Sequence, residues 1–429
     1  MIGKSPAQAL TFALAHIESD TARWIDDMSR MIAIDTSFPP GRGYAGFSDL
    51  MEELCAPLGF SFERVAVPDH LWAAPGSAGA RINLIARRRM SRPVCSVYFH
   101  VDTVPAGDGW TLPPHGLTQI GDKLHGRGTA DMKGTIAATL AALRGAAAAG
   151  LPLAYDPTLL FCTDEEGGLY PGVRYLAEQG LIEGHVMCLN GSAAPRIWAG
   201  CFGSLDLAVR IEGRAAHSGD PVDGINAVEE SVPILTALLA LKPRIETRRS
   251  AMPPPPYRQN EGLAARLNVT ALHAGAKGSA LPGQCTILIN RRYLPEENYD
   301  EVRAELDGAI RAAAAGTRAL SVAIDVVGHL APVRDPDGSA HWPRWRQALS
   351  FGFGYSNDSF QRWGASSSSD MGFVQAAGLK EILLGGLSRP EARVHAADEF
   401  TTIADIRALA RAILVYLADA EVPVARVNA

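Results

Sequence analysis

The chain has 429 residues, of which 47% are hydrophobic and 20% are charged, and its formal net charge is -6. This length suits two domains better than one, and the composition is that of a folded globular protein. The negative balance provides no basic field for nucleic acid or anionic lipid, so neither is an expected partner.

The sequence carries no recognisable targeting or membrane segment. Residues 1–20 mix apolar with charged side chains and lack the apolar block of a signal peptide. No stretch reaches the roughly 18 unbroken apolar residues that are needed to cross a bilayer. The six cysteines are scattered without a CxxC pair, and several lie in apolar strand-like runs, which favours buried free thiols over disulfides or zinc ligands. We therefore expect a cytoplasmic protein.

The first half of the chain has the pattern of an α/β domain. Short apolar runs alternate with longer helical patterns, namely strands at 94–99 and 158–162 and helices at 132–149 and 172–179. Strands that alternate with helices of this length predict βαβ units and a largely parallel sheet, in which ligands bind beyond the carboxyl ends of the strands. His100 closes the first of these strands, and Asp164, Glu165 and Glu166 follow the second.

From about residue 203 the pattern becomes that of an α+β domain. The expected elements are strands at 204–211, 267–272, 286–290 and 322–327 and helices at 224–241 and 298–314. After about residue 331 the chain is predicted to return to the first domain, with a buried strand at 382–384 and a closing helix at 403–417. The predicted organisation is a first domain of residues 1–202 and 331–429 and an inserted domain of residues 203–330.

Two motifs of the first domain place polar side chains at strand and helix ends. His100 and Asp102 are one residue apart, so they lie on the same side of an extended chain. This permits a metal-binding imidazole whose other nitrogen is held by a carboxylate, although a polar strand end with a satisfied histidine is also compatible. The glycines of the segment 126–134 permit a tight turn that aims Asp131 inward, or a helix start that Thr129 or Asp131 caps.

Two further motifs supply acids and a second histidine. Asp164, Glu165 and Glu166 follow one another at the end of a strand, and His395 lies four residues before Glu399 in a predicted loop. Three adjacent acids in a loop are usually only solvated. Beside histidines and another carboxylate, however, they predict a metal site with a base next to it.

These four motifs, in this order, resemble the M20 family of metallopeptidases over nearly the whole chain. The matching segments are His100-Val-Asp102, Gly126 to Gly134, Glu165-Glu166, Gly213 to Gly219 with Gly224 to Ala227, and Val394 to Glu399. The family includes acetylornithine deacetylases, succinyl-diaminopimelate desuccinylases, aminoacylases and a glutamate carboxypeptidase. The resemblance implies an α/β metallohydrolase, with a mainly parallel-sheet catalytic domain and an inserted α+β domain that serves as lid and dimerisation domain.

The resemblance also implies a set of metal ligands. Asp131 would bridge two divalent ions, with His100 and a further acid at the first ion. Glu166 and His395 would complete the second site, and Asp102 would orient His100.

Three more residues receive roles from the same resemblance. Glu165 would take a proton from metal-bound water, whose pKa the ion lowers toward neutrality. His217 would reach the active site of a partner subunit in a homodimer and stabilise the developing oxyanion. Arg292 would grip a substrate carboxylate with two parallel hydrogen bonds, unless it is only a surface arginine on a strand.

One position departs from the family pattern. The family's remaining ligand is an aspartate or glutamate beyond the paired glutamates, but residues 186–195 contain no acid, and Asn190 or Ser192 occupies that place. A neutral amide oxygen binds a dication much more weakly than a carboxylate, so Asn190 is at most a weak ligand. We therefore expect one tightly held ion per chain, which this ligand set allows to be zinc, manganese or cobalt.

The predicted function is a metal-dependent hydrolase that cleaves a C–N bond, other than a peptide bond, in a small carboxylate-bearing substrate. Amide hydrolysis of an N-acyl amino acid is the leading hypothesis. The missing acid also makes hydrolytic deamination of an aromatic amino acid, such as 5-nitroanthranilate, a serious alternative, in which ammonia is released. A non-catalytic binding protein is the third alternative, and the retention of Glu165 argues against it because binding alone needs no base.

Overall fold

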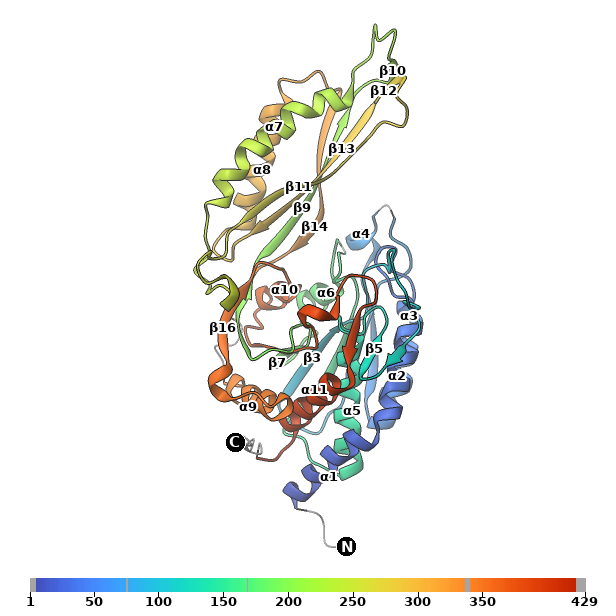
Figure 1. Cartoon of the computed structure of the whole chain (residues 1–429), viewed down its shortest axis with the longest axis vertical. Helices are drawn as coiled ribbons and strands as arrows, with labels where there is room; N and C mark the ends of the chain where they lie inside the picture. The colour runs from blue at the N-terminus through green and yellow to red at the C-terminus, as the bar shows by residue number, and fades with distance from the viewer. Residues whose placement is uncertain (1–4, 75, 168, 336–339, 422–429) are drawn as a thin grey trace. The chain divides into compact units, whose positions relative to one another are not determined.

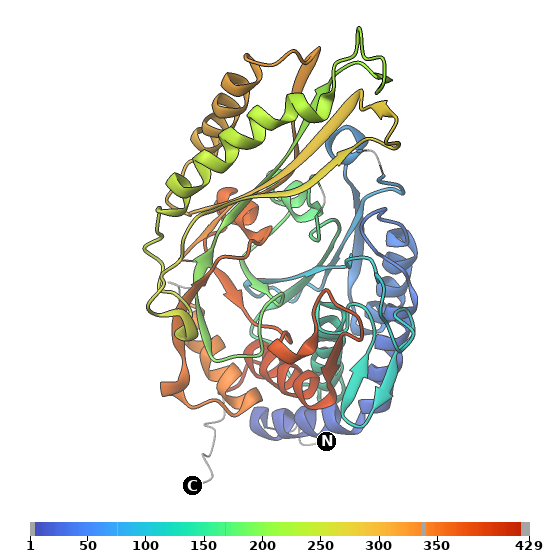
Figure 2. The same ribbon diagram turned by 45° about the horizontal axis from the view of Figure 1, so that its top comes forward.

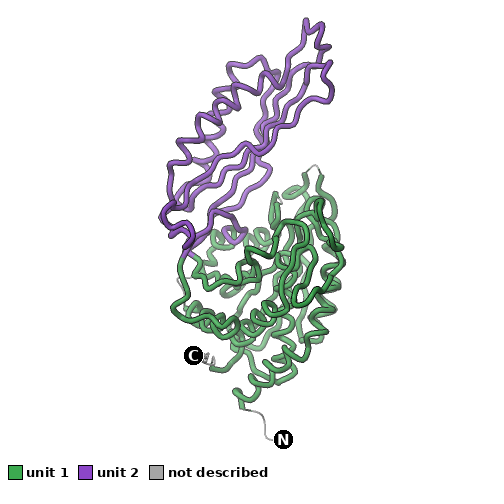
Figure 3. Tube along the Cα trace, in the orientation of Figure 1, with its two compact units in different colours: residues 1–198, 335–362, 373–429 green, residues 199–334, 363–372 purple. Residues whose placement is uncertain are grey.

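The computed structural model describes residues 5–74, 76–167, 169–335 and 340–421. The chain forms two compact units, which are coloured separately in Figure 3. Unit 1 consists of residues 1–198, 335–362 and 373–429, and unit 2 consists of residues 199–334 and 363–372.

The helices of unit 1 are labelled in Figure 1. Its helices are α1 (Pro6–Ser19), α2 (Thr21–Ala33), α3 (Tyr44–Cys55), α4 (Asp69–Trp72), α5 (Lys133–Ala149), α6 (Gly172–Glu178), α9 (Trp342–Phe353) and α11 (Ile403–Leu417). Its strands are β1 (Ser61–Ala66), β2 (Ile82–Arg87), β3 (Val94–His100), β4 (Thr118–Ile120), β5 (Lys123–His125), β6 (Asp156–Cys162), β7 (His185–Cys188), β17 (Ile382–Leu384) and β18 (Phe400–Thr402).

A six-stranded sheet in the order β1-β2-β6-β3-β7-β17 forms the centre of unit 1. Strands β6, β3, β7 and β17 run parallel to one another, whereas β2 runs antiparallel to β1 and β6. Every residue of β6 and β7 is buried, as expected for parallel strands that are covered on both faces. The predicted α/β class with a largely parallel sheet is confirmed, and the carboxyl ends of the four parallel strands lie at one edge.

Small residues allow the helices of unit 1 to approach one another closely. Helix α5 packs against α1, α2 and α11 and is buried along almost its whole length. A Cβ atom at Gly145 of α5 would come within 2.7 Å of the carbonyl oxygen of Ala13 in α1. At Gly352 of α9, a Cβ atom would come within 2.3 Å of the carbonyl oxygen of Ala408 in α11. The alanine-rich and glycine-containing helices are therefore core helices.

Unit 2 is an α+β unit. Its elements are β9 (Gly203–Glu212), β10 (Ala216–His217), α7 (Ala227–Glu246), β11 (Arg266–Ala274), β12 (Ala280–Leu281), β13 (Gln284–Tyr293), α8 (Tyr299–Ala314) and β14 (Ser321–Leu330). The four long strands form an antiparallel sheet in the order β11-β13-β9-β14, and α7 and α8 lie along one of its faces (Figures 1 and 2). Burial alternates along β13, with Cys285, Ile287 and Ile289 buried, because only one face of the sheet is covered.

The remaining elements are three short strands and one short helix. Strands β8 (Arg196–Cys201), β15 (Val333–Arg334) and β16 (Gln361–Ala365) form a three-stranded sheet in the order β15-β8-β16, and α10 spans Met371–Ala376. No helix in the described part of the chain is both long and apolar enough to cross a bilayer. All six cysteines are buried free thiols, as the sequence predicts.

The division into units differs from the predicted domains at one segment. The predicted insertion covers residues 203–330, whereas unit 2 covers residues 199–334 and also 363–372. The prediction assigned this second segment to the first domain. It groups with unit 2 because the backbone N–H of Phe202 lies within hydrogen-bonding distance of the carbonyl oxygens of Ala365 and Ser367, and Ser368 accepts from Arg292.

Candidate metal centre

Four of the predicted ligands meet at the carboxyl edge of the unit 1 sheet. His100 is the last residue of β3, Asp131 lies in the loop that leads into α5, and Glu166 follows β6. His395 lies in the loop before β18, in a left-handed backbone conformation with a φ of 65°. The sheet topology thus brings together residues that are far apart along the chain.

Three of the four side chains have ligand atoms close enough to share one cation, and the fourth, His395, contacts two of these three. The Nε2 atom of His100 lies 3.0 Å from one carboxylate oxygen of Asp131, and the Nε2 atom of His395 lies 3.4 Å from the other. Nε2 of His395 is also 3.0 Å from a carboxylate oxygen of Glu166. Among the described residues, His100, Asp131 and Glu166 form a group whose ligand atoms all lie within 4.8 Å of one another. Asp131 therefore stands between the two histidines, with one oxygen toward each.

The centre is buried on one side and open on the other. The side chain of His100 is fully buried and that of Glu166 is 4% exposed, whereas the side chain of His395 is 51% exposed. A small molecule would therefore reach the centre on the side of His395.

The predicted orientation of His100 by the Asp102 carboxylate takes a different form in the structure. Nδ1 of His100 lies 3.0 Å from the main-chain carbonyl oxygen of Asp102 and 3.8 Å from its carboxylate. The carboxylate of Asp102 instead accepts a hydrogen bond of 2.9 Å from the backbone N–H of Glu166. With Nδ1 donating to the carbonyl, Nε2 of His100 is the nitrogen that can bind a metal ion.

The electrostatics of the centre favour a cation. Hydrogen bonds with Asp131 and Glu166 raise the pKa of His395 to about 10. Burial is the largest single influence on the pKa of His100 and would lower it, but the hydrogen bond and charge of Asp131, together with the charges of Glu165 and Asp102, raise this pKa well above 6.5. The carboxylates of Asp131 and Glu166 therefore favour a positive charge at this centre. Two imidazole nitrogens and two carboxylates are a donor set that suits zinc, manganese or cobalt, so the residues present fit a divalent ion.

Glu165 and Asn190 lie beside this centre. Asn190 follows β7, and its side-chain amide donates to the Glu165 carboxylate across 3.4 Å. Ser192, the other neutral residue at the position of the family's acid, is exposed and pairs through its backbone with Ser388.

A buried ion pair that the sequence analysis missed supports the Glu165-Glu166 turn. The carboxylate of Asp164 accepts hydrogen bonds of 2.6 Å from Arg81 and 2.8 Å from the hydroxyl of Tyr44. Burial raises the pKa of Asp164 to about 6 despite this pairing. The guanidinium of Arg81 also stacks over Trp72 at 4.1 Å and donates to several backbone carbonyls. Arg81 stands alone in the sequence, so no local pattern indicated this role.

The two remaining predicted site residues belong to unit 2. His217 lies at the end of β10 with an exposed side chain, and its Nδ1 accepts a hydrogen bond of 3.1 Å from the backbone N–H of Gly219. Arg292 lies in β13, and its guanidinium donates to Asn290 at 3.2 Å and to Ser368 at 2.7 Å.

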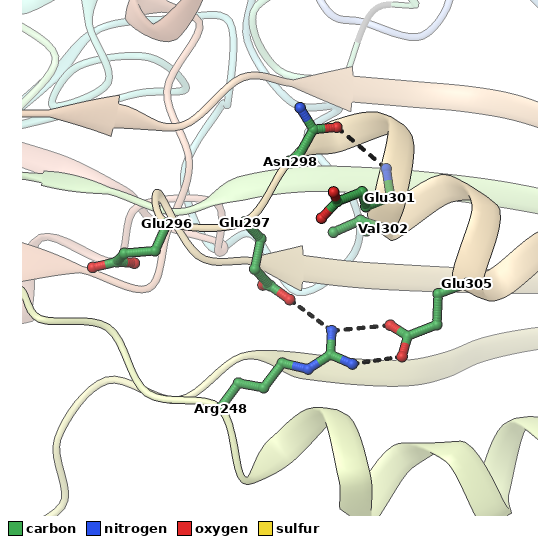
Figure 4. A pocket seen from close by; sticks show the side chains of 7 residues that line it. All are labelled: Arg248, Glu296, Glu297, Asn298, Glu301, Val302 and Glu305. Carbon is green, nitrogen blue, oxygen red and sulfur yellow. Dashed lines mark hydrogen bonds and ion pairs between the residues drawn. The ribbon is translucent and has the colours of Figure 1, made fainter.

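A separate pocket of 360 Å³ in unit 2 is shown in Figure 4. It is lined by Arg248, Glu296, Glu297, Asn298, Glu301, Val302 and Glu305. Arg248 pairs with Glu297 at 2.8 Å and with Glu305 at 2.5 Å, so part of the acidic lining is neutralised internally. The lining contains no histidine and none of the predicted site residues, so this pocket is separate from the candidate metal centre.

Comparison with known proteins identifies sequence relatives of this chain. Over 270 residues the chain is 33% identical to a succinyl-diaminopimelate desuccinylase of Aromatoleum aromaticum, which covers 60% of this chain and 64% of the relative. It is 29% identical to an acetylornithine deacetylase of Erwinia tasmaniensis, over 66% of this chain and 70% of the relative. The chain thus spans a little less than two thirds of the length of the first of these relatives.

The fold extends this likeness over nearly the whole chain. The structure of the dipeptidase Dug1p from Saccharomyces cerevisiae superimposes with a TM-score of 0.77 at 15% identity, covering 95% of this chain and 97% of that one. The sequence profile of the family described as peptidase family M20/M25/M40 matches residues 96–419, a segment that contains His100, Asp131, Glu166 and His395. The profile thus spans the whole candidate metal centre, and the chain belongs to peptidase family M20/M25/M40.

Proposed function

We propose that the chain hydrolyses the amide bond of a small N-acyl amino acid, with a divalent ion held by His100, Asp131, Glu166 and His395. The observation that carries this proposal is the set of contacts that joins two imidazoles and two carboxylates, in which Asp131 contacts both histidines and Glu166 contacts His395. Glu165 lies next to Glu166 in the same turn. When bound there, the ion would polarise the scissile carbonyl and lower the pKa of water. We propose zinc or manganese as the ion, with cobalt also acceptable.

Glu165 is the proposed general base and later the proposed acid. Its carboxylate would accept a proton from the attacking water and deliver it to the nitrogen that leaves as an amine. The amide of Asn190, which donates to Glu165 across 3.4 Å, would hold the carboxylate in place for this exchange. Binding alone would need no such base, so Glu165 favours an enzyme over a non-catalytic binding protein.

A carboxylated substrate is supported by Arg292 and by the relatives. The contacts with Asn290 and Ser368 fix the orientation of the Arg292 guanidinium, which can then pair with a carboxylate through two parallel hydrogen bonds. The names of the relatives, a desuccinylase and a deacetylase, refer to the removal of acyl groups. Together these observations favour an N-acyl amino acid over a neutral amide.

We further propose a homodimer in which His217 acts on the partner subunit's substrate. Apolar side chains are exposed on α7 (Val232 and Leu239) and on the edge strand β11 (Leu272), which would favour contact with a second copy. The free thiols favour a reducing compartment, so we propose the cytoplasm as the location.

Asn190 favours one second candidate, the hydrolytic deamination of an aromatic amino acid such as 5-nitroanthranilate. Without a carboxylate at this position, the centre would hold one ion rather than two. It would then have less positive charge with which to stabilise the tetrahedral intermediate of amide cleavage. Water would replace the aromatic amine with a hydroxyl group and release ammonia, and no acetate or succinate would be freed.

The test is product analysis with the zinc-loaded and manganese-loaded protein. N-acetyl and N-succinyl amino acids and 2-aminobenzoates are each incubated with the protein, and free amino acid, carboxylic acid and ammonia are measured. Release of acid and amino acid in equal amounts supports amide hydrolysis. Release of ammonia from an aminobenzoate contradicts it in favour of deamination, and no product from any substrate class contradicts both.

A further inference from the structure

Glu399 is a buried carboxylate that the proposed mechanism does not use. It lies four residues after His395, and the residue is 1% exposed. One of its oxygens accepts from Nη1 of Arg127 at 2.7 Å and from the backbone N–H of Gly128 at 3.1 Å. The other oxygen accepts from the backbone N–H groups of Ala130 at 3.0 Å and Asp131 at 3.2 Å.

These four hydrogen bonds join two parts of the metal centre. The donors all belong to the loop 127–131, which carries Asp131, whereas Glu399 belongs to the segment that carries His395. Next to Glu399, Phe400 of β18 pairs with His125 of β5, so the two segments are also aligned by backbone pairing. The preceding residue, Asp398, binds a different loop through Thr111 and Leu112. Of the two carboxylates of Asp398 and Glu399, it is therefore that of Glu399 that binds the loop 127–131, which carries Asp131.

We propose that Glu399 is a positioning residue that sets the distance between His395 and Asp131 and thereby the affinity of the centre for a divalent ion. This inference rests on the proposed function in one respect, namely that the centre holds such an ion. The contacts indicate that Glu399 acts through its neighbours, because its two oxygens are occupied by the loop 127–131.

The arrangement requires a carboxylate rather than any polar side chain of the same size. Both oxygens of Glu399 accept two hydrogen bonds each, and all four partners are donors. A glutamine has one acceptor oxygen and one NH₂ group. In either orientation its NH₂ group would face two N–H donors, and burial would keep water from replacing the lost bonds. The loop 127–131 would then shift, and Asp131 would shift with it.

The test compares Glu399→Gln with a control that breaks an equally buried ion pair elsewhere in unit 1. Asp27 on α2 pairs with Arg144 on α5 at 2.6 Å, with side chains 4% and 7% exposed, and neither residue contacts the metal centre. Both Glu399→Gln and Asp27→Asn are expected to lower the melting temperature. The affinity of each purified, metal-stripped protein for Zn²⁺ and Co²⁺ is measured by competition with a chelator, and the Co²⁺ absorption spectrum reports the ligand geometry.

We expect Glu399→Gln to weaken Zn²⁺ binding by about 10-fold to 100-fold and to alter the Co²⁺ spectrum, as outer-sphere changes commonly do. Asp27→Asn should leave both unchanged. Equal Zn²⁺ affinity in Glu399→Gln and the wild type would overturn the positioning role while leaving the proposed function intact. Failure of the wild type itself to bind either ion would overturn both proposals.

A milder variant keeps the test decisive if Glu399→Gln does not yield folded protein. Arg127→Lys removes the guanidinium bond to Glu399 but retains the positive charge and the three backbone N–H donors. We expect a smaller but measurable loss of Zn²⁺ affinity in Arg127→Lys. An affinity equal to that of the wild type, in folded protein, would contradict the proposal.

Discussion

The side-chain amide of Asn190 donates a hydrogen bond to the carboxylate of Glu165, the proposed base, across 3.4 Å. A carboxylate in place of Asn190 would repel Glu165 unless a cation lay nearby. The amide of Asn190 therefore offers Glu165 a hydrogen bond, where the acid of the family pattern would place a second negative charge.

Metal stoichiometry tests this difference. We expect the wild type to hold about one zinc or manganese ion per chain after dialysis, because Asn190 contributes no negative charge. Asn190→Asp should bind a second ion, whereas Asn190→Ala should remain at one. Elemental analysis of the three proteins gives the answer, and two tightly held ions in the wild type would show that Asn190 or another neutral group is a competent ligand.

Glu165→Gln should separate catalysis from binding. Loss of a general base commonly reduces the rate by about 100-fold to 10,000-fold, and kcat should fall by that amount while the bound metal stays unchanged. Glu183→Gln is a suitable control because Glu183 is an exposed glutamate that pairs with Arg89. Retention of most of the activity in Glu165→Gln would remove Glu165 from the proposed mechanism.

Mixing two inactive variants should reveal whether His217 acts across subunits. In a heterodimer of Glu165→Gln and His217→Ala chains, action in trans leaves one intact site and action in cis leaves none. Random pairing makes half of the dimers heterodimers, so about a quarter of the wild-type activity is expected in trans. The two chains can be co-expressed with different tags and assayed together, and an inactive mixture of verified heterodimers would exclude action in trans.

His185 should make the stability of unit 1 depend on pH. Burial and the neighbouring His341, whose ring stacks on that of His185 at 3.8 Å, lower the pKa of His185 from 6.5 to about 3. The unfolded chain therefore binds a proton that the folded chain excludes between these two values. Stability that is present above pH 6.5 is lost as the pH falls toward 3, by about 1 kcal/mol between pH 6 and pH 5.

Urea unfolding at several pH values, in the wild type and in His185→Gln, measures this contribution. The free energy of unfolding of the wild type should fall more steeply below pH 6.5 than that of the variant. Parallel curves for the two proteins would show that His185 does not titrate as its surroundings indicate.

The sequence predicted those features whose signal is local. Apolar periodicity located β3, β6 and the helix α11, which spans the predicted residues Ile403–Leu417. The predicted metal ligands come from short motifs in the sequence, and the family resemblance assigned their roles. The N-terminal helices α1 to α3 were not predicted, because the first elements expected from the sequence begin at residue 94.

The contacts that hold the centre together could not be predicted. Glu399 binds a loop about 270 residues away in the sequence. Arg81, which precedes β2, binds Asp164, which follows β6. Such pairs depend on which strands become neighbours, and a single sequence does not record this. For the same reason, the carboxylate of Asp102 was expected at His100 but contacts the backbone of Glu166.

The pairing of β17 with β7 has a consequence for how the protein is made. These parallel neighbours, Ile382–Leu384 and His185–Cys188, are separated along the chain by the whole of unit 2. During synthesis from the N-terminus, the sheet of unit 1 cannot be completed until unit 2 has left the ribosome. Because His395 follows β17, the nascent chain acquires the last of the proposed metal ligands only when translation is nearly finished. Binding of an ion by all four proposed ligands would therefore have to wait until nearly the whole chain has been made.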